Sequence, residues 1–206
     1  LDTTAFDAKL VHISTDYVFD GAKVGPYTED DVPNPINAYG RTKLEGERAV
    51  LDACPQAAVV RTAWLYGRAG KNFVKTMLRM GQDGAPLSVV CDQRGSPTWT
   101  RDLARQVVAL AETEHAGLFH ATSQGACSWH EFACAIFEEA ALKVNVEPVS
   151  SQEFVQPAGR PANSELDNAR LRAVGLDVMP HWREGLRGFM AAYLPRERVE
   201  KREVTT

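Results

Sequence analysis

Short apolar runs that end in polar residues alternate with segments of helical periodicity along the first half of this chain. The run 9–13 is β-branched and apolar and stops at the polar residues 14–16, and the run 57–66 also ends in side chains able to contact a ligand. Between them lie a Gly- and Pro-rich loop over 20–37 and a helical pattern over 38–53. This order predicts a right-handed βαβ unit in a parallel sheet, with a functional loop at the carboxyl ends of its strands.

The second half of the chain continues this alternation. Ser128 and Glu131 have the spacing of a capping box and predict a helix that reaches about residue 141. After Pro195 the charges are mixed without periodicity, which predicts a disordered tail over 195–206. The remaining expected elements are helices over 73–78, 103–112 and 182–193, and strands over 87–91 and 117–121.

Composition narrows the classes of function. The 23 Lys and Arg against 27 Asp and Glu are dispersed, so nucleic acid is not an expected partner. No apolar stretch approaches the roughly 20 residues of a membrane span, which favours a cytoplasmic protein without a membrane partner. The four cysteines and five histidines show neither a Cys-x-x-Cys nor a metal-ligand spacing, so we expect reduced thiols and no metal site.

Tyr39 and Lys43 form a Tyr-x-x-x-Lys pair inside the expected helix. A spacing of four residues places the phenol and the ammonium on one helix face. A fixed cation favours the phenolate form, so such a pair suits proton donation to an alkoxide. The spacing alone is common on solvated helix faces.

The segments 13–21 (Ile-Ser-Thr-Asp-Tyr-Val-Phe-Asp-Gly) and 39–43 (Tyr-Gly-Arg-Thr-Lys) together resemble the extended short-chain dehydrogenase/reductases, and among them the dTDP-4-dehydrorhamnose reductase family. The resemblance runs from about residue 9 to 193. Further blocks similar to that family follow in the same order, at 61–67, 72–77, 92–98 and 160–167.

This resemblance implies a reduction of the 4-keto group of dTDP-4-dehydro-L-rhamnose to dTDP-L-rhamnose by hydride from NADPH or NADH. Tyr39 is then the general acid, Thr15 bonds the reacting carbonyl, and Lys43, with Tyr39 and Ser14, holds the cofactor. The implied substrate-binding residues are Asp16, Tyr17, Trp64, Asn72, Arg160 and Asn163. The alternative, purely structural roles are core packing for Tyr17 and Trp64, a surface ion pair for Arg160 and a helix cap for Asn72.

The same resemblance implies an α/β fold, the C-terminal portion of a Rossmann-type doubly wound parallel sheet with a smaller α/β substrate-binding domain. The expected division assigns 1–70 to the dinucleotide-binding domain, with about 100–124 returning to it. The segments 71–99 and 125–194 then form the sugar-nucleotide-binding domain. A homodimer is an open option.

Two other functions remain open at this point. The fold also occurs in the non-catalytic regulatory subunit of methionine adenosyltransferase. A sugar-nucleotide epimerase or dehydratase is the second alternative, and Tyr17 disfavours it because related dehydratases carry a Glu after the Asp.

The 206 residues contain no Gly-x-Gly-x-x-Gly that follows a strand, the motif that grips the cofactor pyrophosphate. We therefore expect these residues alone to bind dinucleotide weakly or not at all, and the choice between NADP and NAD is not readable from them. Titration of the purified 206-residue chain with NADPH, followed by cofactor fluorescence, checks this. Micromolar affinity would contradict the expectation.

Overall fold

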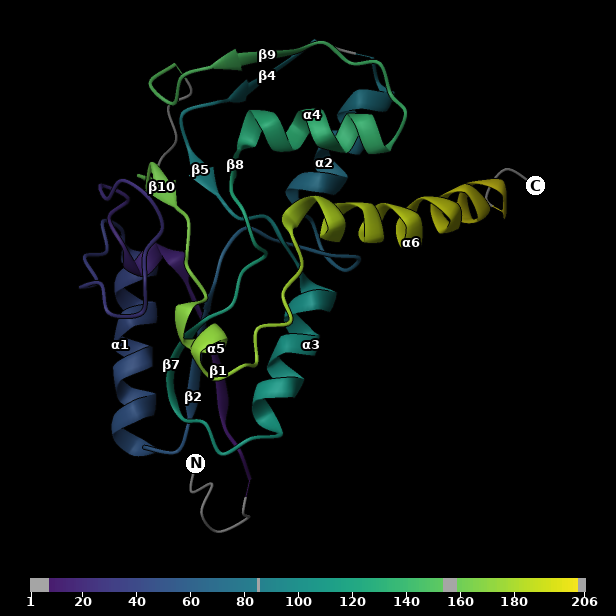
Figure 1. Cartoon of the computed structure of the whole chain (residues 1–206). Coiled ribbons are helices and arrows are strands. Elements are labelled where there is room, and N and C mark those ends of the chain that lie inside the picture. Colours follow the sequence, from purple (N-terminus) through teal and green to yellow (C-terminus); the bar gives the residue numbers. More distant parts are fainter. Residues whose placement is uncertain (1–7, 85, 154–158, 204–206) are drawn as a thin grey trace.

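A parallel three-stranded sheet forms the base of the structure, a computed structural model that describes residues 8–84, 86–153 and 159–203, with side chains described as far as residue 194. Its strands β1 (Val11–Thr15), β2 (Ala58–Thr62) and β7 (Gly117–His120) lie in the order β1-β2-β7. Helices α1 (Ala38–Ala53) and α3 (Thr100–Ala111) cover opposite faces of this sheet (Figure 1). The predicted helix over 38–53 is confirmed, and the polar ends of β1 and β2 meet at one edge of the sheet.

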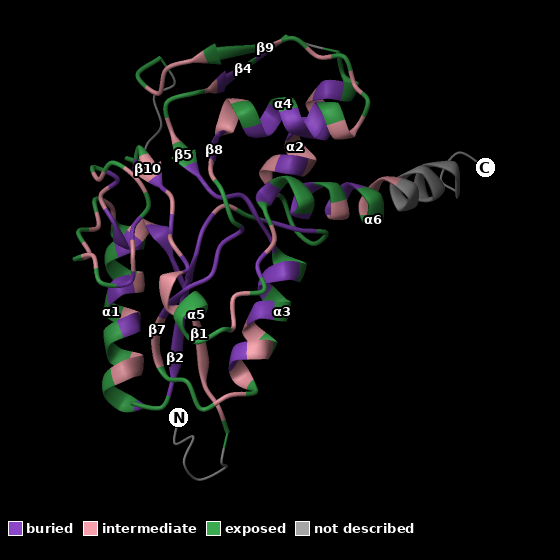
Figure 2. Ribbon diagram, viewed as in Figure 1, coloured by how far each residue is buried: buried purple, intermediate pink, exposed green. Residues whose placement is uncertain are grey.

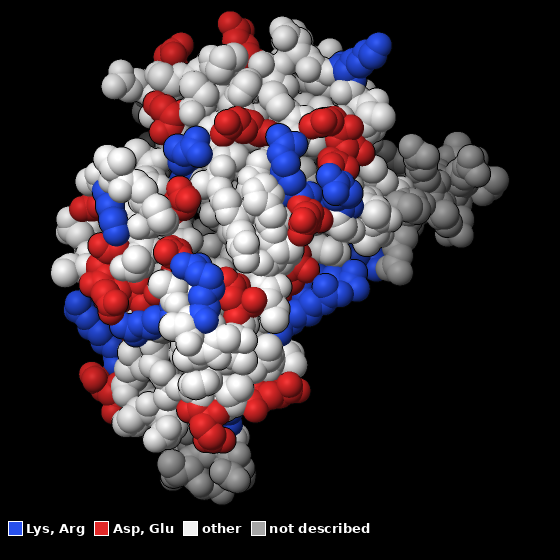
Figure 3. All heavy atoms as spheres, in the orientation of Figure 1, with Lys and Arg blue, Asp and Glu red and all other residues white. Residues whose placement is uncertain are grey.

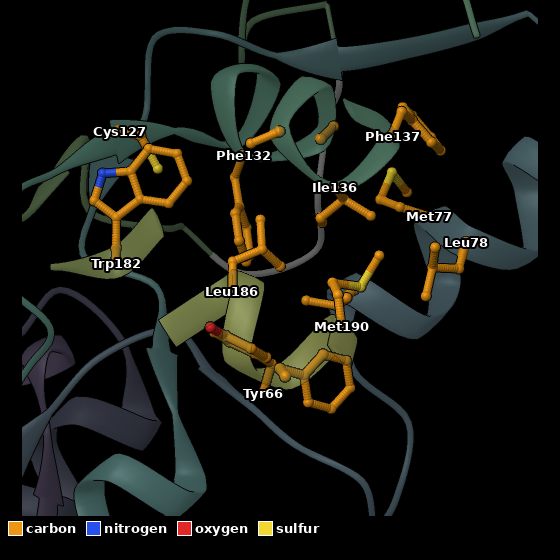
Figure 4. Close-up of a cluster of buried hydrophobic side chains, with 14 of the residues drawn as sticks. Tyr66, Met77, Leu78, Cys127, Phe132, Ile136, Phe137, Trp182, Leu186 and Met190 are labelled. Carbon is orange, nitrogen blue, oxygen red and sulfur yellow. The ribbon is translucent and has the colours of Figure 1, made fainter. Parts of the chain in front are cut away.

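A second hydrophobic core lies beyond that edge. It is enclosed by α2 (Phe73–Gln82), α4 (Trp129–Glu139) and the first turns of α6 (Trp182–Glu203), under the paired strands β4 (Leu87–Val90) and β9 (Val146–Val149). Figure 4 shows its aromatic and aliphatic side chains between α4 and α6, and Figure 2 shows buried positions on the inward sides of these helices. The smaller elements are η2 (Asp16–Val18), β3 (Leu65–Tyr66), β5 (Arg94–Gly95), β6 (Thr98–Trp99), β8 (Cys127–Ser128), β10 (Asn163–Ser164) and α5 (Ala169–Ala173).

The capping box predicted at Ser128 is confirmed. The Glu131 amide donates to Ser128 Oγ at 3.0 Å, and the Ser128 amide donates to Glu131 Oε2 at 2.6 Å. Both orphan amides at the start of α4 are therefore satisfied. The placement of β7 beside β2 agrees with a return of the chain to the first sheet, while the division into two domains stays a prediction.

The strand expected over 57–66 is shorter than predicted. β2 ends at Thr62, and Trp64 has φ 48°, a left-handed backbone conformation that no extended strand can contain. The chain leaves the sheet at this residue, and β3 pairs instead with β6. The apolar run 57–66 predicted one strand because the break falls at a tryptophan, which is usually favourable in strands.

The prediction of a disordered tail over 195–206 was wrong for 195–203, where α6 continues to Glu203. Pro195 and the loss of apolar periodicity suggested a break. The Arg-, Glu- and Lys-rich sequence that follows nevertheless has high intrinsic helix propensity, which does not need an apolar face. Residues 204–206 lie outside the described part of the chain.

The charges on the face shown in Figure 3 are mixed in sign. Lys and Arg side chains stand beside Asp and Glu at several places on this face, as their dispersion along the sequence predicts. Within the ranges that the structure describes, no helix combines the length and the apolar character needed to cross a membrane.

A buried ion pair ties α1 to the sheet. Arg61 on β2 donates from Nε to Glu47 Oε1 at 2.9 Å and from Nη2 to Glu47 Oε2 at 2.7 Å, and the two side chains are 2% and 4% exposed. Ser14 Oγ on β1 donates to the same Oε1. The Arg61 guanidinium also lies 5.1 Å from the centre of the Phe19 ring. One carboxylate therefore joins the helix to both neighbouring strands.

Glu47→Gln should lower the free energy of unfolding by about 3–5 kcal/mol, because Arg61 would keep its charge in a buried site without a counter-charge. Urea denaturation at pH 7 measures this. Glu138→Gln is the matched control, since its partner Arg183 is exposed and 3.4 Å away, and it should cost less than about 1 kcal/mol. Equal costs for the two variants would contradict a special role of the buried pair.

Candidate active site

A cleft of about 740 Å³ opens where β1 and β2 end. Thr15 and Thr62 are opposite residues in the strand register, so the segments that follow both strands reach the same place. Ligands in open α/β sheets bind at this edge. The predicted site residues that line the cleft are Ser14, Thr15, Asp16, Tyr17, Tyr39, Trp64 and Arg160.

Tyr39 reaches the cleft from the first turn of α1. Asn37 is the N-cap of this helix, and its Oδ1 accepts from the Gly40 amide at 2.8 Å. A Cβ at residue 40 would lie 2.0 Å from the Tyr17 carbonyl oxygen, so only glycine permits this close approach of helix and loop. The Tyr39 ring contacts the Tyr17 ring edge to face, with centroids 5.6 Å apart, and is 54% exposed. The phenol is thus positioned at the open side of the cleft.

Lys43 lies behind Tyr39 on the same helix and is half-buried. Its Nζ donates to the Ile13 carbonyl oxygen on β1 at 2.6 Å. Lys43 is not among the residues that line the cleft. Its ammonium is therefore anchored between helix and strand, with donor capacity left for a ligand beside Tyr39.

Thr15 and Asp16 form the floor of the cleft. Thr15 Oγ1 donates to Asp16 Oδ1 at 2.9 Å and accepts from the Tyr17 amide at 3.3 Å. Burial raises the pKa of Asp16 to about 6, and the nearby hydroxyl groups of Ser164 and Thr15 limit the rise. The carboxyl therefore changes charge close to neutral pH.

Tyr17 stands beside this carboxyl and is half-buried. Burial raises the pKa of its phenol, the negative charge of Asp16 adds to the rise, and the positive charge of Arg160 opposes it. Tyr17 therefore stays protonated as a hydrogen-bonding and packing group.

Trp64 forms part of the cleft wall and is held rigidly. Its ring stacks on Trp129 of α4, with centroids 3.5 Å apart and an interplanar angle of 4°. A Cβ at Gly95 would come within 2.4 Å of the Trp64 ring, so glycine is needed there as well. Trp129 covers one face of the Trp64 indole, which leaves less flat surface for a sugar than the sequence suggests.

Two predicted substrate-binding residues do not line the cleft. Asn72 is the N-cap of α2: its Oδ1 accepts from the Lys75 amide at 3.2 Å and its Nδ2 donates to the Gly67 carbonyl. The helix-cap interpretation of Asn72 is confirmed. Asn163 Nδ2 donates to the carbonyl oxygens of Lys23 and Gly25, at 2.9 and 2.7 Å, and so holds the loop that precedes α1.

The cleft also contains residues that the sequence reasoning missed, namely Asn37, Ala38, Thr62, Ala63, Leu65 and Gly159. Thr62 is the notable one, because its buried Oγ1 has no hydrogen-bond partner among the described residues. A polar residue at the end of a buried parallel strand was the signal that identified Thr15, and it applies equally to Thr62. Over the same described ranges, no cluster of three or more His, Cys, Asp or Glu side chains could hold a metal ion.

Comparison with known proteins agrees with this geometry. A family model described as RmlD substrate binding domain matches residues 2–194. A probable dTDP-4,6-dihydroxy-2-methyloxan-3-one 4-ketoreductase of Streptomyces antibioticus is 47% identical over 180 residues, which are 86% of this chain and 61% of that protein. A dTDP-4-dehydrorhamnose reductase of Sinorhizobium fredii is 42% identical over 196 residues, which are 90% of this chain and 66% of that protein.

Solved structures show the same fold. The crystal structure of a dTDP-4-dehydrorhamnose reductase from Bacillus anthracis in complex with NADP superposes with a TM-score of 0.89 at 46% identity, over 92% of this chain and 68% of that one. The predicted α/β class with parallel sheets is thereby confirmed. This chain spans 61% and 66% of the length of the two curated relatives named above. By the match of its residues 2–194, the chain belongs to the RmlD substrate binding domain family.

Proposed function

We propose that this chain carries the acid and the substrate-binding part of a reductase that converts dTDP-4-dehydro-L-rhamnose to dTDP-L-rhamnose. The observation that carries the proposal is the convergence of Tyr39 and Thr15 on one cleft at the carboxyl edge of the sheet. Reduction of a ketone places negative charge on its oxygen. Donors aimed at that oxygen therefore stabilise the transition state more than the ground state.

The roles of the side chains follow from their positions. Tyr39 Oη holds the proton that the product oxygen receives. Thr15 must exchange its hydrogen bond to Asp16 for one to the substrate carbonyl, and rotation of the hydroxyl allows this. Lys43 keeps a positive charge behind Tyr39 and is fixed by the Ile13 carbonyl.

NADPH is the cofactor that we propose, because the Bacillus anthracis relative was solved with NADP. When bound, the cofactor supplies the hydride, which no side chain can supply. The residues present fit such a ligand: Ser14, Tyr39 and Thr62 line the cleft, and Thr62 offers a buried hydroxyl without a protein partner among the described residues. A cytoplasmic location and a homodimer stay predictions from the sequence.

The same cleft argues against a dehydratase and against a regulatory subunit. Asp16 is the single acidic residue among the described residues that line it, and a dehydratase of the related kind uses a second carboxyl group to exchange protons during the elimination of water. A purely regulatory subunit has no need of an acid and a cation aligned on one helix. Reduction is therefore the activity that these residues support best.

Tyr39→Phe should reduce kcat for the keto-sugar by about 10²–10⁴-fold, because it removes the proton donor and leaves the cleft wall in place. The affinity for the sugar nucleotide should change little. Steady-state kinetics and a binding titration measure both, on the chain as encoded with any residues that precede Leu1. Tyr193→Phe on α6, which is not among the residues that line the cleft, is the matched control and should keep full activity. Unchanged turnover in Tyr39→Phe would favour the regulatory alternative.

Asp16→Asn should change how stability depends on pH. The pKa of Asp16 in the folded protein, about 6, is above its ordinary value of 3.8, so the folded state retains a proton that the unfolded state releases. This group therefore makes the native protein less stable as the pH rises from about 4 to 6. The gain in stability of Asp16→Asn over the native protein should be larger at pH 7 than at pH 4 by roughly 2–3 kcal/mol.

Urea denaturation of both proteins across this pH range measures the difference. The buried His120 has a pKa lowered to about 3 and gives an opposite slope. It is present in both proteins, so its contribution cancels in the comparison. A difference that does not vary with pH would show that Asp16 titrates normally.

A further inference from the structure

Three polar side chains that do not line the cleft converge beside Gly185 on α6. They come from three other parts of the fold: Tyr66 from β3, Asp102 from the first turn of α3, and Ser123 from the segment after β7. A Cβ at residue 185 would lie 3.3 Å from Asp102 Oδ2, 3.4 Å from Tyr66 Oη and 3.9 Å from Ser123 Oγ. The three oxygens therefore surround one small volume.

All three groups are buried, with exposed fractions of 2% for Tyr66, 6% for Asp102 and 1% for Ser123. Tyr66 Oη, Asp102 Oδ2 and Ser123 Oγ have no hydrogen-bond partner in the part of the chain that the structure describes. In Figure 4 the Tyr66 hydroxyl lies at the margin of the apolar cluster and points away from Met77 and Leu78. A buried polar group without a partner is costly, and three at one point are hard to reconcile with a stable core.

We propose that one ordered water molecule binds between Tyr66, Asp102 and Ser123, at the space that the absence of a side chain at Gly185 leaves. The hydrogen bonds balance. Tyr66 and Ser123 each donate to the water oxygen, and the water donates to Asp102 Oδ2. Three hydrogen bonds are typical of a buried water. Burial raises the pKa of Tyr66, so its hydroxyl is a donor at every pH of interest.

This water joins segments that are distant in sequence and close to the cleft wall. Leu65 lines the cleft and Tyr66 is the next residue, so the water anchors the strand that forms this wall to α3 and to the segment after β7. Ser123 is held from the other side, because its amide donates to Thr98 Oγ1 on β6 at 3.1 Å. The site therefore acts as a structural joint between the first sheet and the second core, independent of the reaction proposed above.

Tyr66→Phe distinguishes a hydroxyl that bonds a water from a hydroxyl without a partner, because the two cases change the stability of the protein in opposite directions. If the hydroxyl bonds a water, the variant loses a hydrogen bond, and the unfolding equilibrium constant should rise roughly three- to tenfold. If the hydroxyl has no partner, its removal from the core should leave that constant unchanged or lower it. Ser123→Ala should follow Tyr66→Phe in sign. An unfolding constant that is unchanged or lower in both variants would overturn the proposal.

Gly185→Ala places a methyl group where the water would bind. In this background Tyr66→Phe should no longer raise the unfolding constant, because the hydroxyl has already lost its partner. Gly46→Ala in α1 is the control: its Cβ has only an ordinary contact of 3.8 Å, so it should stabilise the protein as helix propensity predicts. If Gly185→Ala stabilises to the same degree, the proposal is wrong.

A crystal structure of the native protein at high resolution gives the direct test. We expect one density peak within hydrogen-bond distance of the three oxygens, absent in Gly185→Ala. A peak with contacts near 2.4 Å, together with stability that depends on sodium, would show a cation instead and would overturn the assignment to water.

Discussion

The geometry of the site depends on the buried pair of Glu47 and Arg61. Tyr39, Lys43 and Glu47 follow one another at intervals of four residues, so they share one stripe of α1. The guanidinium of Arg61 donates two parallel hydrogen bonds to the Glu47 carboxylate. This bidentate geometry allows little rotation of either side chain. Since the helix is rigid, fixing Glu47 against the sheet also fixes the directions in which Lys43 and Tyr39 point.

This arrangement has an energetic cost at the cleft. Asp16 loses hydration, as its raised pKa records, and Thr62 keeps a hydroxyl without a partner among the described residues. Such groups weaken the folded state and are kept in proteins where they contact a ligand. The two hydrophobic cores on either side of the cleft offset this cost. The cleft thus holds groups that lower the stability of the folded state.

Much of the fold could be predicted because long amphipathic helices and buried strands produce a recognisable pattern of apolar residues in the sequence. Helix α1, for example, matches its predicted bounds. Two-residue strands such as β5 and β6 are too short to produce such a pattern. The conformation of Trp64 depends on Trp129 and Gly95, which are distant in sequence. The predicted residues at the end of β1 and in the first turn of α1 were found at the cleft. Asn72 and Asn163 were not, because an amide that caps a helix or holds a loop looks the same in sequence as one that binds a ligand.

The stacked indoles of Trp64 and Trp129 have a consequence for observation. Two parallel rings 3.5 Å apart couple their electronic transitions, so the pair has an optical signature that isolated tryptophans lack. One ring lies in the cleft wall and the other on α4, and any movement between them changes that coupling. The molecule therefore carries an intrinsic chromophore that reports on the shape of its own cleft without a label.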